Sequence, residues 1–125
     1  MKNEDKLIMS KKVNLASPKA GAKIIDVSDD FFAKCDRMLN DTDPIFIDEK
    51  YDDHGKWMDG WETRRKRTKG YDYLILKFGK PGVIKKVDVD TSYFSGNHPD
   101  EISLQACISK KKIPDKKTKK KRRRR

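Results

Sequence analysis

The residues best suited to chemistry lie in one short stretch, residues 56–67. It contains both tryptophans of the chain, two carboxylates and a run of four cations, in the order Lys-Trp-Met-Asp-Gly-Trp-Glu-Thr-Arg-Arg-Lys-Arg. Large aromatic surfaces beside groups of opposite charge are typical of a pocket for a small polar molecule. The sequence therefore predicts a binding site for a small anion in this stretch.

A second candidate group is the carboxylate pair Asp88 and Asp90, which lie two residues apart on a predicted strand and so share one face. Paired carboxylates can share a proton or bind a metal. The alternative is a structural role, in which they accept hydrogen bonds from neighbouring loop amides and from the hydroxyls of Thr91 or Ser92.

The histidines give no sign of a metal site. His54 and His98 each lack metal-ligand spacing to another histidine or cysteine, so no metal is predicted and the cofactor stays unknown. A surface or loop-capping role is expected for both. Cys107 has no histidine near it in sequence and is not predicted to be a nucleophile.

These residues need a scaffold, and the apolar pattern predicts an antiparallel β-sandwich. Short runs of alternating or β-branched apolar residues are separated by Gly, Pro and polar turns. The predicted strands are 23–27, 44–47, 71–78, 83–90 and 102–108. A short helical turn is expected between Asp29 and Leu39, with Ser28 as its N-cap.

Charge divides the chain into a neutral body and a basic tail. Residues 110–125 contain twelve basic residues and one acid, which accounts for the whole net charge of +11. The predicted organisation is a flexible stretch 1–12, a single domain 13–109, and a low-complexity tail 110–125 with too little apolar surface to order. No signal or membrane-spanning segment is apparent, so a cytoplasmic protein is expected.

Five blocks resemble the allantoicase family, in order and with nearly uniform spacing, from about Val13 to about Ile108. They are Asn14-Leu15-Ala16, Ser28-Asp29-Asp30-Phe31-Phe32-Ala33, residues 56–67, Pro81-Gly82-Val83-Ile84, and residues 87–97. The resemblance implies hydrolysis of allantoate to ureidoglycolate and urea. It also implies a jelly-roll β-sandwich, similar to galactose-binding or discoidin-type domains, in a family whose full-length members carry two such repeats and form homo-oligomers.

Allantoate carries one carboxylate and two ureido arms, so its hydrolysis needs a cation for the carboxylate, polar groups for the ureido arm, and a base or metal to activate water. Arg64 and Arg65 are the predicted carboxylate holders, because a guanidinium can pair bidentately. The predicted catalytic residues are Asp59, Glu62, Asp88 and Asp90, and the predicted substrate-binding residues are Trp61, Arg64, Arg65 and Asn97. The alternative is a solvated charged strand, with the tryptophans filling the core.

The chain resembles most of the first repeat of the family and nothing of the second. An incomplete jelly roll leaves an open strand edge, so the chain alone is expected to associate and to lack allantoicase activity. Two other functions remain open. One is a non-catalytic jelly-roll module that binds a small polar ligand. The other is a nucleic-acid-associated protein that binds through the basic tail, while no membrane partner is expected.

Overall fold

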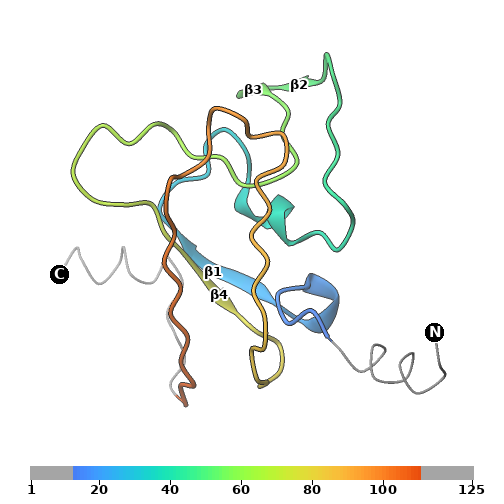
Figure 1. Ribbon diagram of the computed structural model, residues 1–125, viewed down its shortest axis with the longest axis vertical. Helices are drawn as coiled ribbons and strands as arrows, with labels where there is room; N and C mark the ends of the chain where they lie inside the picture. Colours follow the sequence, from blue (N-terminus) through green and yellow to red (C-terminus); the bar gives the residue numbers. More distant parts are fainter. Residues whose placement is uncertain (1–12, 111–125) are drawn as a thin grey trace.

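Short antiparallel strands and two 3-10 helices, joined by long irregular segments, form the structure (Figure 1). It is a computed structural model that describes residues 13–110. In chain order the elements are η1 (Pro18–Ala20), β1 (Lys23–Val27), η2 (Cys35–Leu39), β2 (Tyr51–Asp52), β3 (Gly55–Lys56) and β4 (Leu74–Lys77). β1 pairs with β4 and β2 with β3, both antiparallel, and no α-helix occurs within residues 13–110. The predicted all-β class is confirmed at this level.

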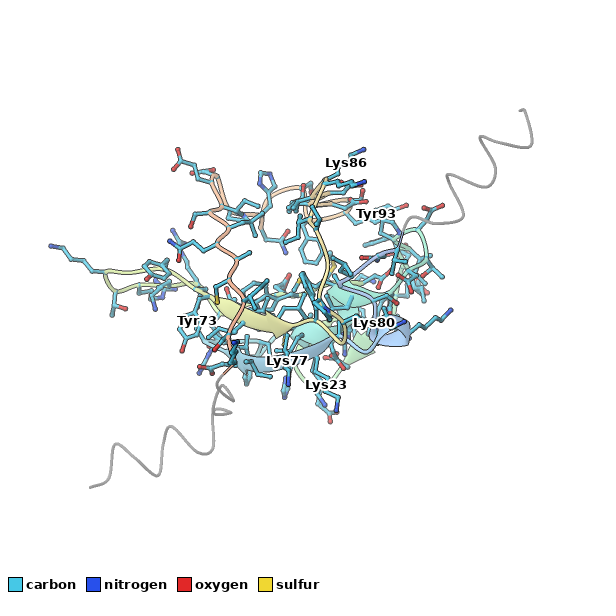
Figure 2. All side chains as sticks on the ribbon, turned by 90° about the horizontal axis from the view of Figure 1, so that it is seen from below. Lys23, Tyr73, Lys77, Lys80, Lys86 and Tyr93 are labelled. Atoms are coloured by element: carbon cyan, nitrogen blue, oxygen red, sulfur yellow. The ribbon has the colours of Figure 1, made fainter. Side chains whose placement is uncertain are left out.

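The central pair is β1 with β4, which joins residues about fifty positions apart in sequence (Figure 1). The strand predicted over 23–27 forms as expected, and the one predicted over 71–78 forms only at Leu74–Lys77. Lys23 lies opposite Lys77, and both extend to the same side of the molecule (Figure 2). Opposed like charges weaken a strand pair, so packing and backbone hydrogen bonds hold this one.

Three predicted strands are wrong, because their backbone groups find no partner strand within residues 13–110. In the first, 44–47, the amide of Ile45 donates to the Asp59 carboxylate instead, over 3.0 Å. Segments 83–90 and 102–108 run as irregular chain (Figure 1). Their alternating apolar side chains face solvent, since no described strand covers them. The predicted common face for the aspartates at 88 and 90 is therefore wrong as well.

The predicted helical turn exists as η2, but its cap is not the one predicted. Lys34 occupies the N-cap position and makes no side-chain capping hydrogen bond. The Ser28 hydroxyl instead donates to the Asp72 carboxylate at 2.8 Å and accepts from the Tyr73 amide at 2.9 Å. Ser28 thus ties the segment after β1 to the segment before β4.

The largest buried cluster lies among loops rather than between sheets. It consists of Ala33, Met58 and Phe94. A Cβ placed on Gly60 would come within 2.9 Å of the Phe94 ring, so the absence of a side chain at Gly60 admits that ring. This contact fastens the turn around residue 94 onto the stretch 58–62, where the predicted site residues are concentrated.

A second close packing contact joins two glycines, Gly21 and Gly79, at the end of the β1–β4 pair. A Cβ on Gly79 would lie 2.4 Å from the carbonyl oxygen of Ala20 and 2.6 Å from the Cα of Gly21. Distances this short leave no room for a methyl group. Gly21 also has a φ of 91°, in the left-handed region that favours glycine. The two main chains therefore touch directly at this point.

The two cysteines lie in contrasting surroundings, which leads to a labelling prediction. Cys35 is buried, and burial, with Asp30 beside it, raises the pKa of its thiol to about 11. Cys107 is exposed and free. Because the thiolate is the reactive form, a thiol reagent at pH 8 is expected to label Cys107 promptly and Cys35 only as the chain unfolds. Rapid labelling of both thiols in the native chain would contradict this prediction, and peptide mass spectrometry would identify the labelled sites.

The predicted flexible stretch 1–12 and residues 111–125 of the basic tail lie outside the described residues, as does any nucleic-acid contact through that tail. The division into these three parts stays a prediction. Within residues 13–110, no helix has the length and apolarity needed to cross a bilayer.

Candidate functional site

The site is organised around Asp29, the second residue after β1. Its carboxylate accepts hydrogen bonds from the amide of Phe31 at 2.9 Å and from the amide of Arg64 at 3.1 Å. Its carbonyl oxygen accepts from the indole Nε1 of Trp61 at 2.7 Å. One aspartate therefore holds both the chain that follows β1 and the stretch 61–64.

Asp29 also forms an ion pair with Arg64. The distance from Arg64 Nε to Asp29 Oδ2 is 2.7 Å, and the exposed fraction of the aspartate side chain is only 15%. Burial alone would raise the pKa of Asp29, but the amides of Phe31 and Arg64 and the guanidinium together hold it below its usual value. The carboxylate is therefore ionised at neutral pH.

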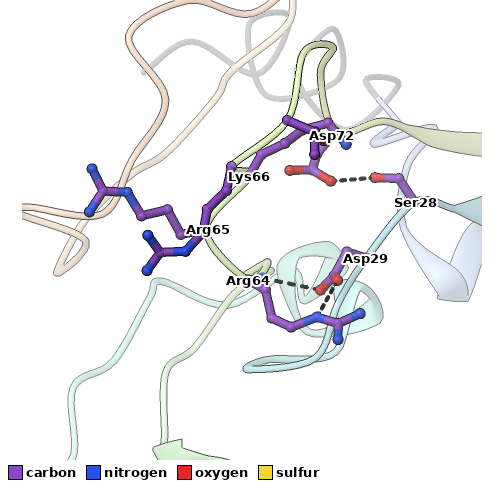
Figure 3. Close-up of a pocket in the computed structure, with 8 residues that line it drawn as sticks. Ser28, Asp29, Arg64, Arg65, Lys66 and Asp72 are labelled. Atoms are coloured by element: carbon purple, nitrogen blue, oxygen red, sulfur yellow. Dashed lines mark hydrogen bonds and ion pairs between the residues drawn. The ribbon is translucent and has the colours of Figure 1, made fainter.

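A pocket of about 340 Å³ opens beside this ion pair (Figure 3). Its lining residues are Ser28, Asp29, Arg64, Arg65, Lys66, Arg67, Thr68 and Asp72. Figure 3 shows Arg64 directed at Asp29 and Asp72 directed at Ser28, while Arg65 extends away from Asp29. Four cations against two carboxylates give the pocket a net positive charge, which suits a small anion. Arg64 and Arg65 both line this pocket, although only Arg64 is held in place by a carboxylate.

A second cluster pairs Glu62 with Asn97, residues that lie 35 positions apart. The side-chain amide of Asn97 donates to Glu62 Oε2. The backbone of Glu62 forms an antiparallel bridge with Ala33, and its amide donates to the Ala33 carbonyl oxygen at 3.0 Å. Burial raises the pKa of Glu62, and the Asn97 hydrogen bond opposes that increase without cancelling it. A carboxyl group with a raised pKa is a candidate proton donor or acceptor.

Trp61 connects the two clusters. It precedes Glu62 in the chain, and its indole reaches Asp29, which holds Arg64. Trp61 is half-buried, as is Trp57, while the intervening Met58 enters the core cluster. Within the stretch 57–64, the Met58 side chain is therefore buried and both tryptophans are partly exposed to solvent.

The structure does not bring the other predicted catalytic residues to these clusters. Asp59 accepts from the amide of Ile45, which fixes the loop before β2. Asp90 accepts from the amide of Ser92 at 2.8 Å, and hydrogen bonds from Ser92 lower the Asp90 pKa. Asp88 is exposed. Within residues 13–110, no hydrogen bond or ion pair links Asp88 or Asp90 to Glu62. The predicted catalytic roles of Asp59, Asp88 and Asp90 stay predictions.

Sequence reasoning missed Asp29, Ser28 and Asp72 as parts of the site. Ser28 and Asp29 belong to one of the five blocks that resemble the allantoicase family. The block therefore indicated this segment, but not the part that the two residues play in the pocket. Asp72 reaches the pocket only because β1 pairs with β4, which the sequence does not specify. In the described part of the chain, no group of three or more His, Cys, Asp or Glu side chains is placed to hold a metal ion.

The antiparallel strand pairs define a β-class protein, and its cation-rich pocket carries a net positive charge. Comparison with known families is more specific. The family model described as Allantoicase repeat matches residues 13–125, and the chain belongs to that family.

Curated relatives share well over half of their aligned residues with the chain. It is 57% identical over 107 residues to "Probable allantoicase 1" of Burkholderia mallei, which covers 86% of this chain and 32% of that protein. It is 58% identical over 96 residues to "Probable allantoicase" of Acinetobacter baylyi, covering 77% of this chain and 29% of that protein. The chain therefore spans about a third of the length of these relatives. No solved structure gave a significant match.

Proposed function

We propose that the chain serves in the allantoicase reaction, the hydrolysis of allantoate to ureidoglycolate and urea. The observation that carries this proposal is the 57% identity to a probable allantoicase over 86% of the chain. An aligned span of that length includes most of residues 13–110, and therefore most of the pocket and the Glu62–Asn97 pair. The pocket chemistry agrees with the proposal, because allantoate is a small anion.

The residues of the two clusters divide the chemistry between them. The cations of the pocket, with Arg64 held by Asp29, bind the substrate carboxylate through charge-assisted hydrogen bonds. Asn97 and Trp61 supply polar and aromatic surface to the ureido arm. Glu62, whose pKa burial raises, donates a proton to the nitrogen that leaves with urea while water attacks the carbon of the breaking C–N bond, and it regains a proton from that water.

The proposal extends to the architecture of the family. Segments 83–90 and 102–108 leave apolar side chains exposed within residues 13–110. We propose a jelly-roll sandwich, of the galactose-binding or discoidin type, in which chain from outside residues 13–110 covers this apolar surface. The same uncovered surface supports a homo-oligomer as the working form.

The test is a urea-release assay with the purified 125-residue chain and allantoate, combined with calorimetric measurement of allantoate binding. The proposal expects allantoate to bind to the chain. Urea is expected to form, in a one-to-one ratio with the allantoate consumed, only when association covers the open strand edge, because the chain alone is expected to lack turnover. An Arg64→Ala variant is expected to bind allantoate about ten- to a hundredfold more weakly, because a hydrogen bond to a charged group contributes roughly 1.5–3 kcal/mol. Absence of both binding and urea release would overturn the proposal.

A non-catalytic binding module is the second candidate, and one observation favours it. The structure unites the anion pocket with a single carboxyl group of raised pKa, while Asp88 and Asp90 lie apart from it. A chain that binds allantoate saturably but releases no urea, even when it associates, would establish this second function. Association of the chain, followed by sedimentation at low and physiological salt, would then show whether a second copy restores turnover.

A further inference from the structure

Asp29 makes more contacts with the predicted substrate-binding residues than any other described residue does. Its carbonyl oxygen accepts from Trp61 Nε1 at 2.7 Å, and its carboxylate accepts from the Arg64 amide at 3.1 Å and from Arg64 Nε at 2.7 Å. Three hydrogen bonds from two of the predicted ligand-binding residues thus converge on one residue. These hydrogen bonds do not suit Asp29 to bind the substrate, because its own carboxylate would repel the substrate anion. An acid–base role for Asp29 does not account for them either.

We propose that Asp29 is a positioning residue, which fixes the guanidinium of Arg64 at the anion pocket and anchors the indole of Trp61 through its own carbonyl oxygen. This inference rests on the proposed binding of allantoate at that pocket. The two oxygens of the carboxylate divide the task. Oδ1 holds the backbone, through the amides of Phe31 and Arg64, and Oδ2 holds the guanidinium.

The burial of the partners explains why such a residue is needed. The exposed fraction of the Arg64 side chain is 65%, whereas that of the Asp29 side chain is 15%. A long side chain this exposed would sample many rotamers, and binding would have to fix one of them at an entropic cost. Engaging Nε leaves the two terminal nitrogens of the guanidinium free for a ligand while limiting its orientation. The ring of Phe31, 5.3 Å from the guanidinium carbon, covers one side of it.

The Asp29→Asn variant separates positioning from simple charge neutralisation. Asparagine retains one oxygen for the two backbone amides, but it turns an N–H group toward Arg64 Nε, where donor faces donor. It also removes a negative charge from the pocket. If Asp29 only offsets the charge of Arg64, the variant binds allantoate more tightly. If Asp29 positions Arg64, the variant binds it about tenfold more weakly, equivalent to 1.4 kcal/mol.

A second readout does not depend on allantoate. In ¹⁵N-labelled full-length chain, the Arg64 Nε–H and the Trp61 indole N–H each give one resonance, and the chain has only two indoles to assign. Asp29→Asn is expected to raise solvent exchange of the Arg64 Nε–H at least tenfold and to leave the Trp61 indole bonded to the backbone carbonyl. Asp52→Asn is the matched control, because it removes the other ion pair, Arg37 with Asp52 at 3.3 Å.

The outcomes separate this inference from the proposed function. Faster exchange of the Arg64 Nε–H in Asp29→Asn, with unchanged exchange in the Asp52→Asn control, supports the positioning role. This conclusion holds even if the parent chain fails to bind allantoate, a result that would overturn only the proposed function. Unchanged exchange, or tighter allantoate binding, overturns the positioning role. If Asp29→Asn fails to fold, Arg64→Lys gives the decision. The lysine keeps the positive charge, and the Asp29 carboxylate keeps its hydrogen bonds from the two backbone amides, but the Nε group is lost. The positioning role therefore predicts weaker allantoate binding. Unchanged allantoate binding would contradict the positioning role.

Discussion

The Phe94→Ala variant is expected to lose about 3–5 kcal/mol of unfolding free energy, the usual cost of truncating a buried aromatic side chain. The exposed fraction of Phe94 is 8%, and it is the only aromatic residue in the buried cluster of the described chain. Its ring occupies the space that Gly60 leaves open. The loss should therefore separate the turn around residue 94 from the stretch 58–62, and urea unfolding would measure it.

This prediction also has a local consequence, because Phe94 lies three residues before Asn97. When the ring is removed, Asn97 should lose its hydrogen bond to Glu62, which the Asn97 side-chain amide resonances would report. Tyr71→Ala is the matched control. The exposed fraction of Tyr71 is 80%, so its truncation should change stability by no more than about 0.5 kcal/mol. Equal losses from the two variants would show that the cluster at Phe94 does not act as the core.

In an associated form that turns over allantoate, the Glu62→Gln variant is expected to reduce urea release by about 10²–10⁴-fold, the usual contribution of a positioned acid or base. Glutamine cannot transfer a proton, but its amide oxygen can still accept from Asn97, so the shape of the site is kept. Allantoate binding should change little, since the cations of the pocket are intact. Initial rates and calorimetric affinities, measured on the same protein preparation, would separate the two effects.

The stability of Glu62→Gln provides the control, and its sign follows from the pKa. Burial raises the pKa of Glu62 above its usual 4.5, so ionising it costs the native state free energy at neutral pH. The neutral glutamine avoids that cost. The variant should therefore be at least as stable as the parent chain at pH 7, and its advantage should shrink as the pH falls through the raised pKa toward 4.5. The stability of the variant relative to the parent should be compared at the two pH values. If this relative stability is lower at pH 7 than at pH 4.5, the native state holds Glu62 as a carboxylate.

Of the strands whose backbone partners lie within the described chain, the sequence predicted β1 and β4 and missed the short pair β2–β3. The β-branched run at Lys23–Val27 and the alternation before Lys77 became β1 and β4, because each supplies the other with hydrogen bonds. The equally clear alternation of Val87 and Val89 produced no strand. Alternation of apolar and polar residues indicates a strand with one face to bury, but it does not identify the strand that would pair with it or cover it.

Site residues could be predicted from the sequence where their residue type indicates a role. They could not be predicted where the role depends on contacts between residues far apart in the sequence. Arg64, Arg65 and Trp61 were predicted as site residues because guanidinium and indole groups beside carboxylates indicate an anion site. The pocket is lined by Arg64 and Arg65, and the binding roles of all three stay predictions. The raised pKa of Glu62 depends on burial, which its sequence neighbours do not show, and the hydrogen bond from Asn97, 35 positions away, opposes the increase. The role of Asp29 was masked by its turn-like neighbours, since a polar Ser-Asp-Asp segment after a strand usually indicates only a loop.

The direct contact between Gly21 and Gly79 has a consequence for the gene. Every single-base change in a glycine codon is either silent or replaces glycine with a residue that has a Cβ, or with a stop. At position 79 any such Cβ meets the main chain of Ala20 and Gly21. Random mutagenesis should therefore recover only silent changes at that codon among folded clones, while neighbouring Lys80, whose side chain is exposed, should accumulate replacements freely.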